Sequence, residues 1–314
     1  MKKLNEKKII DLINKKGKNF LSEDVEIFRL GNEQFAVSVD TLVESTDIPK
    51  GSKLSDISRK SVISSVSDFA AKGISPKFCI ISLTLPSKIT QAQVEGISKG
   101  FTKACKEFRI QLLGGDTNRG TEISIHVVLF GKVKKIVKRN SSKIGDIVCT
   151  TGPFGYTGAA LNIMLKNKKS SKKFTKKAKK MFFSPTPPLD FGIKSANLMT
   201  ASMDSSDGLA SCLNEMASQS KKKFVIDNLP VNPDVIEFSK KNRTDLLKLV
   251  FAGGEEFEIV FTVNPKNLKK IHSIGKNLGI NIIEIGHVIK GKGVFLENHS
   301  KWLEFWYKGW DHFR

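Results

Sequence analysis

The N-terminal half of the chain changes from the two-residue hydrophobic period of strands to the longer period of helices and back, an order that few folds accommodate. FAVSVD at 35–40 alternates as a strand does and would end at Asp40. Apolar residues at helical spacing follow in 61–73, where Gly73 is placed to end the helix and Asp68 lies off the apolar stripe. Both kinds of element within so short a stretch predict a layered α/β unit.

Another helix and three strands are predicted before residue 138. Thr90 and Gln93 have the spacing of a capping box, and the helix that they would begin carries an apolar stripe. Between two of the strands, the paired glycines of GGDTNRG at 114–120 predict a sharp turn. The helix is expected at 90–108, and the strands at 77–86, 109–113 and 122–133.

A second α/β unit follows a polar, charged linker at 134–146. The sequence DIVCTTGPFGYTGAA predicts a strand, a glycine-rich turn and the start of a helix, and PTPPLDFG at 185–192 predicts a proline-stiffened loop. Residues 256–263 alternate so that a strand there would place its apolar side chains on one face. The expected fold class is α/β of the α+β kind, with one mixed domain at 1–138 and another at 139–314.

The formal net charge of +21 raises the question of nucleic-acid binding, because phosphate backbones attract dispersed lysine and arginine. Only seven of the 52 basic residues are arginine, whereas base-specific recognition relies on the bidentate arginine fork. The densest lysine run, at 166–180, has a single aromatic residue and no pattern suited to base stacking. We therefore expect a solvated helix or loop there and no specific nucleic-acid partner.

The four cysteines are far apart and form no CxxC pair, so the sequence indicates neither a disulfide framework nor a structural zinc site. No apolar run approaches the roughly 18 residues of a membrane span. The first ten residues, MKKLNEKKII, lack the uninterrupted apolar stretch of a signal peptide. We therefore expect a cytoplasmic protein without a membrane partner.

Six aspartates lie at strand ends, polar helix faces or expected turns, and several stand beside glycine. Any one of them alone is explained by a helix cap or a solvated turn, but their recurrence favours a shared site. Hard divalent cations such as Mg²⁺ bind oxygen ligands gathered from separate loops, a chemistry that suits a triphosphate. No Walker A loop and no GxGxxG motif occurs, so nucleotide phosphates would be held through metal and carboxylates. The six are Asp24, Asp40, Asp68, Asp116, Asp204 and Asp207.

Seven segments in order resemble the thiamine-monophosphate kinases, a family of the aminoimidazole-ribonucleotide-synthetase-like superfamily. They are SVDTLVES, SDFAAKG, LLGGDTNRG, TTGPFG, MDSSDGLA, AGGEEFE and the terminal YKGWDHF. The resemblance spans residues 20–314, and the KGWDHF ending is characteristic of the kinases within the superfamily. It implies ATP-dependent phosphorylation of thiamine monophosphate to thiamine diphosphate, by direct transfer assisted by several Mg²⁺ ions. It also implies a homodimer whose N-terminal sheets join, with ATP and Mg²⁺ bound by the N-terminal domain and the C-terminal domain completing the site.

The resemblance also implies roles for individual residues. The metal ligands would be the six aspartates above, with Asp207 the catalytic residue that orders metal and attacking phosphate. The nucleotide contacts would be Ser38, Gly115, Asp116, Arg139 and Ser206. The substrate contacts would be Asp47, Glu255 and Trp310, the last as an aromatic flank for the thiamine ring.

Four departures from the family pattern affect these implied roles, the mildest being GGEE at 253–256 in place of GGED. Glu23 stands where the family has an aspartate, and Val39 stands where a threonine usually contacts metal or nucleotide. Asp47 and Ile48 replace a common His-Phe pair, which removes a substrate contact and adds negative charge near a phosphate ester. We therefore expect these departures to affect substrate affinity more than nucleotide binding.

Three other functions remain open at this stage. The first is a related ATP-dependent enzyme of the superfamily that acts on another phosphorylated small molecule, an alternative supported by Asp47. The second is a non-catalytic binder of thiamine phosphate or nucleotide, against which the retention of so many adjacent charges argues. The third is a basic nucleic-acid-binding protein, which would show steeply salt-dependent affinity for DNA or RNA.

Overall fold

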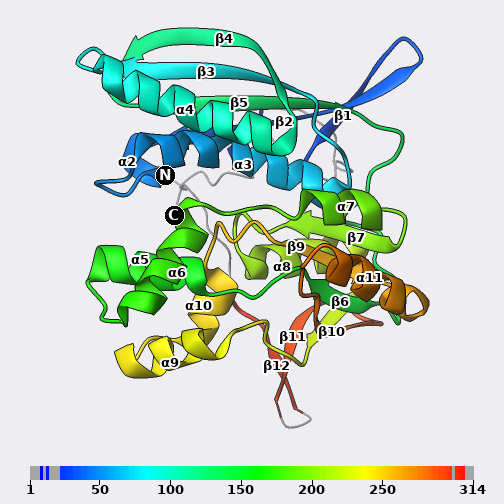
Figure 1. The fold of residues 1–314 in the computed structure, drawn as a ribbon. Coiled ribbons are helices and arrows are strands. Elements are labelled where there is room, and N and C mark those ends of the chain that lie inside the picture. The colour runs from blue at the N-terminus through cyan, green and yellow to red at the C-terminus, as the bar shows by residue number, and fades with distance from the viewer. Residues whose placement is uncertain (1–7, 10–11, 14–21, 299–300, 308–314) are drawn as a thin grey trace.

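The computed structural model describes residues 8–9, 12–13, 22–298 and 301–307. Two mixed sheets, one above the other in Figure 1, form the centres of two α/β domains, as the sequence predicts. The N-terminal sheet has the strand order β1-β2-β5-β3-β4, and the C-terminal sheet has the order β12-β11-β8-β10-β6-β9-β7. The domain boundary at 138/139 stays a prediction, since the chain between β5 and β6 has no regular element.

The N-terminal sheet is antiparallel except where β3 and β4 run side by side in the same direction. Helices α3 and α4 cover one face, and the hydrophobic core lies between the helices and the sheet. The elements are β1 (Glu26–Leu30), β2 (Glu33–Val43), α2 (Glu44–Asp47), α3 (Leu54–Lys72), β3 (Phe78–Pro86), α4 (Gln91–Phe108), β4 (Gln111–Gly120) and β5 (Ser124–Lys132).

The other face of this sheet is open and apolar. Val39, Val128 and Ile80 are paired across β2, β5 and β3, so they share that face. Side chains at least 40% exposed on it are Phe28, Leu30, Val39, Phe78 and Ile80. Five large apolar side chains on one side of one sheet make a surface of the kind that usually contacts another protein.

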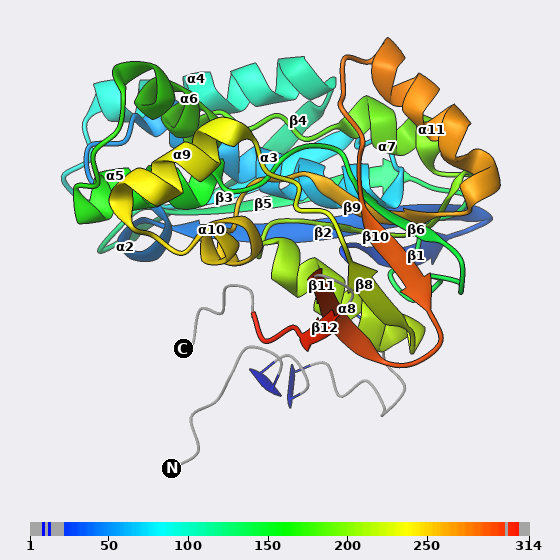
Figure 2. The ribbon, with the colours of Figure 1, turned by 90° about the horizontal axis from the view of Figure 1, so that it is seen from below.

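The C-terminal sheet has helices on several sides. Its strands are β6 (Ile147–Thr150), β7 (Met199–Asp204), β8 (Lys223–Ile226), β9 (Ile259–Val263), β10 (Ile283–Ile289), β11 (Gly293–Asn298) and β12 (Lys301–Glu304). Its helices are α5 (Tyr156–Lys166), α6 (Lys172–Phe183), α7 (Leu189–Ser195), α8 (Leu209–Ser220), α9 (Pro233–Asn242), α10 (Leu246–Ala252) and α11 (Pro265–Asn277). Figure 2 shows α5, α6 and α9 together at one end of the molecule and α7 with α11 at the other.

Helix α3 joins the two domains because it packs against both. Its apolar side chains belong to one continuous core with residues of the N-terminal sheet and with Phe261 of β9. It also contacts α7 so closely that a Cβ on Gly192 would lie 1.9 Å from the backbone oxygen of Ala70. As a consequence, α3 buries polar as well as apolar side chains, including Lys60 and Lys72.

Several local predictions are confirmed. Helix α4 begins with the capping box of Thr90 and Gln93, and Gly73 ends α3 with a φ of 70°. Helix α8 follows MDSSDG directly, with Gly208 as its first cap. The lysine-rich segment contributes α6, which buries Phe174, Ala178 and Phe182 and exposes most of its lysines.

The predicted turn at GGDTNRG is wrong, because these residues lie within β4. Strand β3 pairs with them in register as far as Pro86 opposite Gly120, and this long-range pairing keeps the backbone extended. The glycine that pairing requires is Gly115, where a Cβ would lie 1.8 Å from the oxygen of Ile81. The close approach of β3, rather than a turn, explains why position 115 is a glycine.

Two smaller expectations also differ from the structure. Residues 189–192 of the predicted loop form the start of α7, after the prolines have ended. Strand β9 is buried along its whole length, because β6 and β7 flank it and helices contact it. Neither periodicity nor proline content shows which faces of an element its neighbours will cover. No described helix is long and apolar enough to cross a membrane.

Candidate active site

Three of the six aspartates meet in a partly buried acidic cluster between the two domains, in which Asp204 is the fully buried member. Asp24 precedes β1, Asp68 lies on α3 and Asp204 ends β7, and each offers a carboxylate oxygen within 4.8 Å of the others. Asp40 of β2 adjoins them through a hydrogen bond with Asp68, and it also accepts a hydrogen bond from Ser65 Oγ at 2.8 Å. We call Asp24, Asp40, Asp68 and Asp204 the acidic cluster.

Negative charge in the acidic cluster is only partly compensated. Burial, and then the neighbouring Asp24, raise the pKa of Asp204 to about 7. Burial also raises the pKa of Asp68, where the carboxylates of Asp40 and Asp204 add to the shift. The pKa of Asp40 is raised chiefly by burial, which its hydrogen bonds oppose. Carboxyls that resist ionisation in this way gain from a bound cation.

Asp24 differs from the others because two protein cations contact it. Burial opposes its ionisation, but Arg139 and Lys72 outweigh burial and hold the pKa of Asp24 below its ordinary value. The Nζ atom of Lys72 lies 2.8 Å from Asp24 Oδ2, and Arg139 Nε lies 3.0 Å from Asp24 Oδ1. The implied nucleotide residue Arg139 is thus already paired with an implied metal ligand.

The acidic cluster fits a hard divalent cation. Its donors are all carboxylate oxygens, they come from elements that the fold holds rigidly, and three of them have raised pKa values that a metal ion would reverse. Mg²⁺ is therefore a ligand that these residues can hold.

The loop of MDSSDG and the loop of GGEE are hydrogen-bonded to each other beside this cluster. Ser206 N donates to Asp204 Oδ2 at 3.2 Å, and Ser206 O accepts from Glu255 N at 2.7 Å. Gly208 has a φ of 92°, and a Cβ there would lie 2.6 Å from the oxygen of Gly253. Asp207 adds to the negative charge that acts on Asp204. The structure therefore brings Ser206, Asp207 and Glu255 to the edge of the cluster.

Glu255 is paired with a buried lysine of α3. Lys60 Nζ lies 2.6 Å from Glu255 Oε1 and 3.9 Å from the centre of the Phe182 ring. The Lys60 side chain is 1% exposed, whereas that of Glu255 is 33% exposed. The Glu255 carboxylate is thus partly exposed to solvent, and the buried Lys60 ammonium compensates its charge.

The remaining implied contacts are more scattered. Ser38 is buried on β2, two residues before Asp40, and therefore on the same face of the sheet. Asp47 lies in α2, where its Oδ2 accepts a hydrogen bond from Val43 N at 2.7 Å. Trp310 lies outside the described residues, as does the whole KGWDHF ending at 308–313.

Gly115 and Asp116 are not brought to the acidic cluster within one chain. The pairing register aligns Asp40, Val127, Ile81 and Gly115 across β2, β5, β3 and β4. Gly115 is thus three strands from Asp40, about 14 Å at the usual strand spacing. Asp116 follows Gly115 and so points to the open face of the sheet, opposite to Asp40.

Sequence reasoning named Arg139 but missed Lys72, the other cation at Asp24, and it missed the buried Glu256 near these loops. Lys72 follows Asp68 by four residues, a spacing that places both on one helix face and that a search for basic partners would have found. Glu256 is 4% exposed, and its Oε1 accepts hydrogen bonds from Gly155 N at 2.8 Å and Thr157 N at 3.3 Å. No local signal distinguishes it from the neighbouring Glu255.

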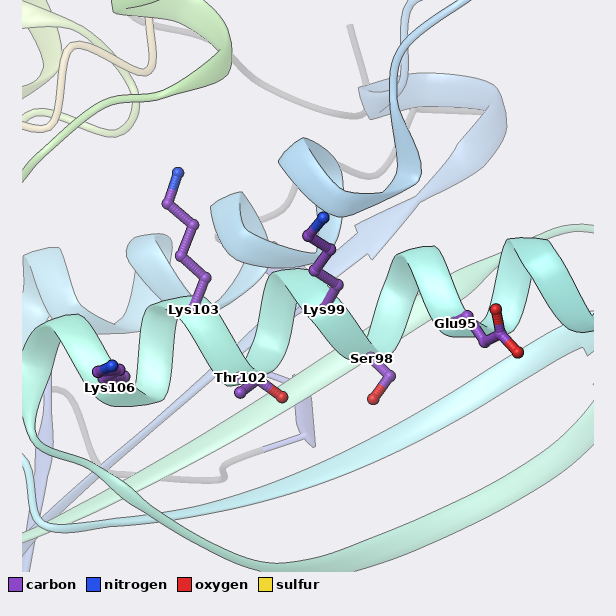
Figure 3. Close-up of a pocket in the computed structure, with 6 residues that line it drawn as sticks. All are labelled: Glu95, Ser98, Lys99, Thr102, Lys103 and Lys106. Atoms are coloured by element: carbon purple, nitrogen blue, oxygen red, sulfur yellow. The ribbon is translucent and has the colours of Figure 1, made fainter.

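A shallow depression on α4 is unrelated to this site. Figure 3 shows its residues along one side of the helix, and none of the six aspartates is among them. They are Glu95, Ser98, Lys99, Thr102, Lys103 and Lys106. A surface built by a single helix without buried polar groups offers little to hold a small ligand.

Comparison with known proteins begins with family models. The model described as AIR synthase related protein, N-terminal domain, matches residues 22–133, and the model for the C-terminal domain of the same proteins matches residues 143–298. These two matches, in the same order as the two mixed α/β domains, show that the chain is an AIR synthase related protein.

Individual relatives narrow this class. Thiamine-monophosphate kinase of Nitrosopumilus maritimus is 52% identical over all of both chains, and that of Pyrococcus horikoshii is 33% identical over 100% of this chain and 98% of its own. The solved structure of "AaThiL complexed with AMPPCP and TMP" matches with a TM-score of 0.87 and 28% identity, covering 99% of this chain and 97% of that one. The chain belongs to the thiamine-monophosphate kinase family.

Proposed function

We propose that this protein transfers the γ-phosphoryl group of ATP to thiamine monophosphate and so forms thiamine diphosphate. The observation that carries the proposal is the acidic cluster, in a chain that is 52% identical along its whole length to a thiamine-monophosphate kinase. The match to a structure complexed with AMPPCP, an ATP analogue, and TMP supports the same pair of substrates.

Phosphoryl transfer depends on positioning and charge neutralisation more than on covalent chemistry. Bound Mg²⁺ would neutralise the phosphate oxygens and hold the two phosphates in line. We assign its binding to Asp24, Asp40, Asp68, Asp204 and Asp207. The attacking group is a phosphate oxygen of thiamine monophosphate, which is already ionised at neutral pH, so no general base is required.

Other residues would orient the two substrates. Ser206 is held between Asp204 and Glu255 and would contact nucleotide phosphate at the start of α8. Glu255 would contact the thiamine portion, whose ring carries positive charge, through its exposed carboxylate. Asp47 already accepts a backbone hydrogen bond, which limits the charge it presents to substrate. Arg139, Ser38 and Trp310 keep their implied contacts as part of the proposal.

We further propose that two copies associate through the open face of the N-terminal sheet. Its exposed apolar side chains would be covered, and Asp116 together with Gly115 would then lie at the interface. In that arrangement Asp116 of one protomer would act at an ATP site near the interface rather than in its own acidic cluster.

The test is chromatographic detection of thiamine diphosphate after incubation of the purified protein with thiamine monophosphate, ATP and Mg²⁺. We expect product that disappears when EDTA is added. Asp227→Asn, which alters an exposed aspartate paired with His287, is the matched control and should keep full activity. Absence of product from a folded protein that still binds ATP with Mg²⁺ would refute the proposed acceptor.

A further inference from the structure

The Lys72 ammonium is surrounded by protein oxygens, as a bound metal ion would be. Its Nζ lies 2.6 Å from Glu23 Oε2, 2.8 Å from Asp24 Oδ2 and 2.9 Å from the backbone oxygen of Ser202. The side chain is 0% exposed. The ammonium group donates hydrogen bonds to Glu23 Oε2 and the Ser202 oxygen, and it forms an ion pair with Asp24 Oδ2, so three protein oxygens surround it.

Its position is fixed by the backbone on both sides. Lys72 is the last residue of α3, its own carbonyl accepts a hydrogen bond from Val137 N, and Ser202 Oγ donates to the oxygen of Ala71 at 2.5 Å. Gly73, which follows, packs against Ala196 so closely that a Cβ would lie 2.5 Å from the Ala196 Cβ. The ammonium group therefore has little freedom to leave its three oxygens.

The same ammonium belongs electrostatically to the acidic cluster. Lys72 lies one helical turn after Asp68, on the same side of α3, and it shares Asp24 with Arg139. Burying a lysine among carboxylates is favourable only when the opposite charges and hydrogen bonds are supplied together, as they are here.

We propose that the Lys72 ammonium is a fixed internal cation that takes one cation position of the acidic cluster. The ammonium group occupies the space between Glu23 and Asp24. Divalent ions therefore bind on the other side of Asp24, where Asp68 and Asp204 lie. The inference rests on the proposed function only in taking the divalent ion to be Mg²⁺ or its substitute Mn²⁺.

Charge balance gives the expected consequence of removing Lys72. Five carboxylates, those of Glu23 and the acidic cluster, face two protein cations, Lys72 and Arg139. Lys72→Met would leave one additional negative charge uncompensated next to three oxygens with the geometry of a cation site. We expect this variant to bind one more Mn²⁺ ion per chain than the wild type.

The measurement is a count of bound Mn²⁺ by electron paramagnetic resonance, without ATP or thiamine monophosphate, at equal protein concentrations. The thermal unfolding temperature is measured for each protein in EDTA and in Mg²⁺. In EDTA, Lys72→Met should unfold at a lower temperature than the wild type, and Mg²⁺ should raise its unfolding temperature by more than that of the wild type. Lys132→Met is the matched control, because Lys132 forms an exposed ion pair with Glu33 far from the acidic cluster. It should leave the count and the recovery unchanged.

A double variant keeps the test decisive if Lys72→Met does not fold. Glu23→Gln with Lys72→Met removes one charge of each sign and replaces a buried pair by neutral side chains of similar size. We expect the double variant to bind the wild-type number of Mn²⁺ ions. A change in its count would overturn the inference, as would an unchanged count in folded Lys72→Met. Because no substrate is present, a shifted count in a protein that forms no thiamine diphosphate would refute the proposed function and leave this inference standing.

Discussion

Glu256→Gln is expected to lack a loss of stability that the wild type shows between acid and neutral pH. The stability of the variant relative to the wild type should therefore rise as the pH rises. Burial raises the pKa of Glu256 from 4.5 to about 8, although hydrogen bonds from Thr157 and Gly155 partly oppose the shift. The folded protein therefore binds this proton more tightly than the unfolded chain. The stability that it contributes is complete below pH 4.5 and is lost as the pH rises through about 8.

The magnitude follows from the width of this pH window. Each pH unit between the two pKa values lowers the free energy of unfolding by about 1.4 kcal/mol. Between pH 5 and pH 7, linkage gives a loss of about 2.5 kcal/mol for the wild type from this group. Glu256→Gln has no proton to lose, and its amide oxygen can still accept from Gly155 N, so it should not show that loss.

The assay is urea unfolding of both proteins at pH 5, 6 and 7 in EDTA. The acidic cluster titrates in wild type and variant alike, so the difference between them isolates Glu256. Glu237→Gln, at an exposed position of α9, should follow the wild type at every pH. A difference between Glu256→Gln and wild type that stays constant from pH 5 to pH 7 would refute the reasoning, whatever its size.

Three further perturbations test the site, the sheet and the interface. Asp68→Asn should lower Mg²⁺-dependent formation of thiamine diphosphate by about 10²-fold or more, without loss of thermal stability in EDTA, because it removes an uncompensated buried charge; near-wild-type turnover would exclude a metal role. Gly115→Ala should destabilise the protein by about 1–3 kcal/mol in urea, because the new Cβ would lie 1.8 Å from the Ile81 oxygen, whereas Gly96→Ala, with its nearest neighbour at 3.8 Å, should not destabilise it. Ile80→Glu should convert a dimer to a monomer in light scattering, and an unchanged mass would remove the sheet interface from the proposal.

Local signals were sufficient for much of the fold. The capping box at Thr90 predicted the first turn of α4, and Gly73 predicted the end of α3, because both depend on neighbours within one helical turn. The turn at GGDTNRG was mispredicted because β3, a distant segment, pairs with it. Glycine content alone does not separate a turn from a strand that another backbone approaches closely.

The candidate site divides in the same way. The residue types alone indicated carboxylates as oxygen donors, and the resemblance to a family assigned metal-ligand roles to six of them. Asp116, however, stands close to glycine in the sequence, as several of the other aspartates do. It still lies on the opposite face of the sheet from Asp40. Which face a strand residue occupies depends on register, and register is set by pairing with other strands.

The amino-acid sequence by itself determined the α/β class, the end of α3, the starts of α4 and α8, the choice of carboxylates as ligands and the family, since each depends on residue types at short spacing. Only the tertiary structure decided that Asp24, Asp68 and Asp204 meet, that Lys72 lies between Glu23 and Asp24, and that Glu256 holds its proton near neutral pH. The physical reason is that burial and the approach of charges depend on segments far apart in the chain, which the packing of α3 against both domains brings together.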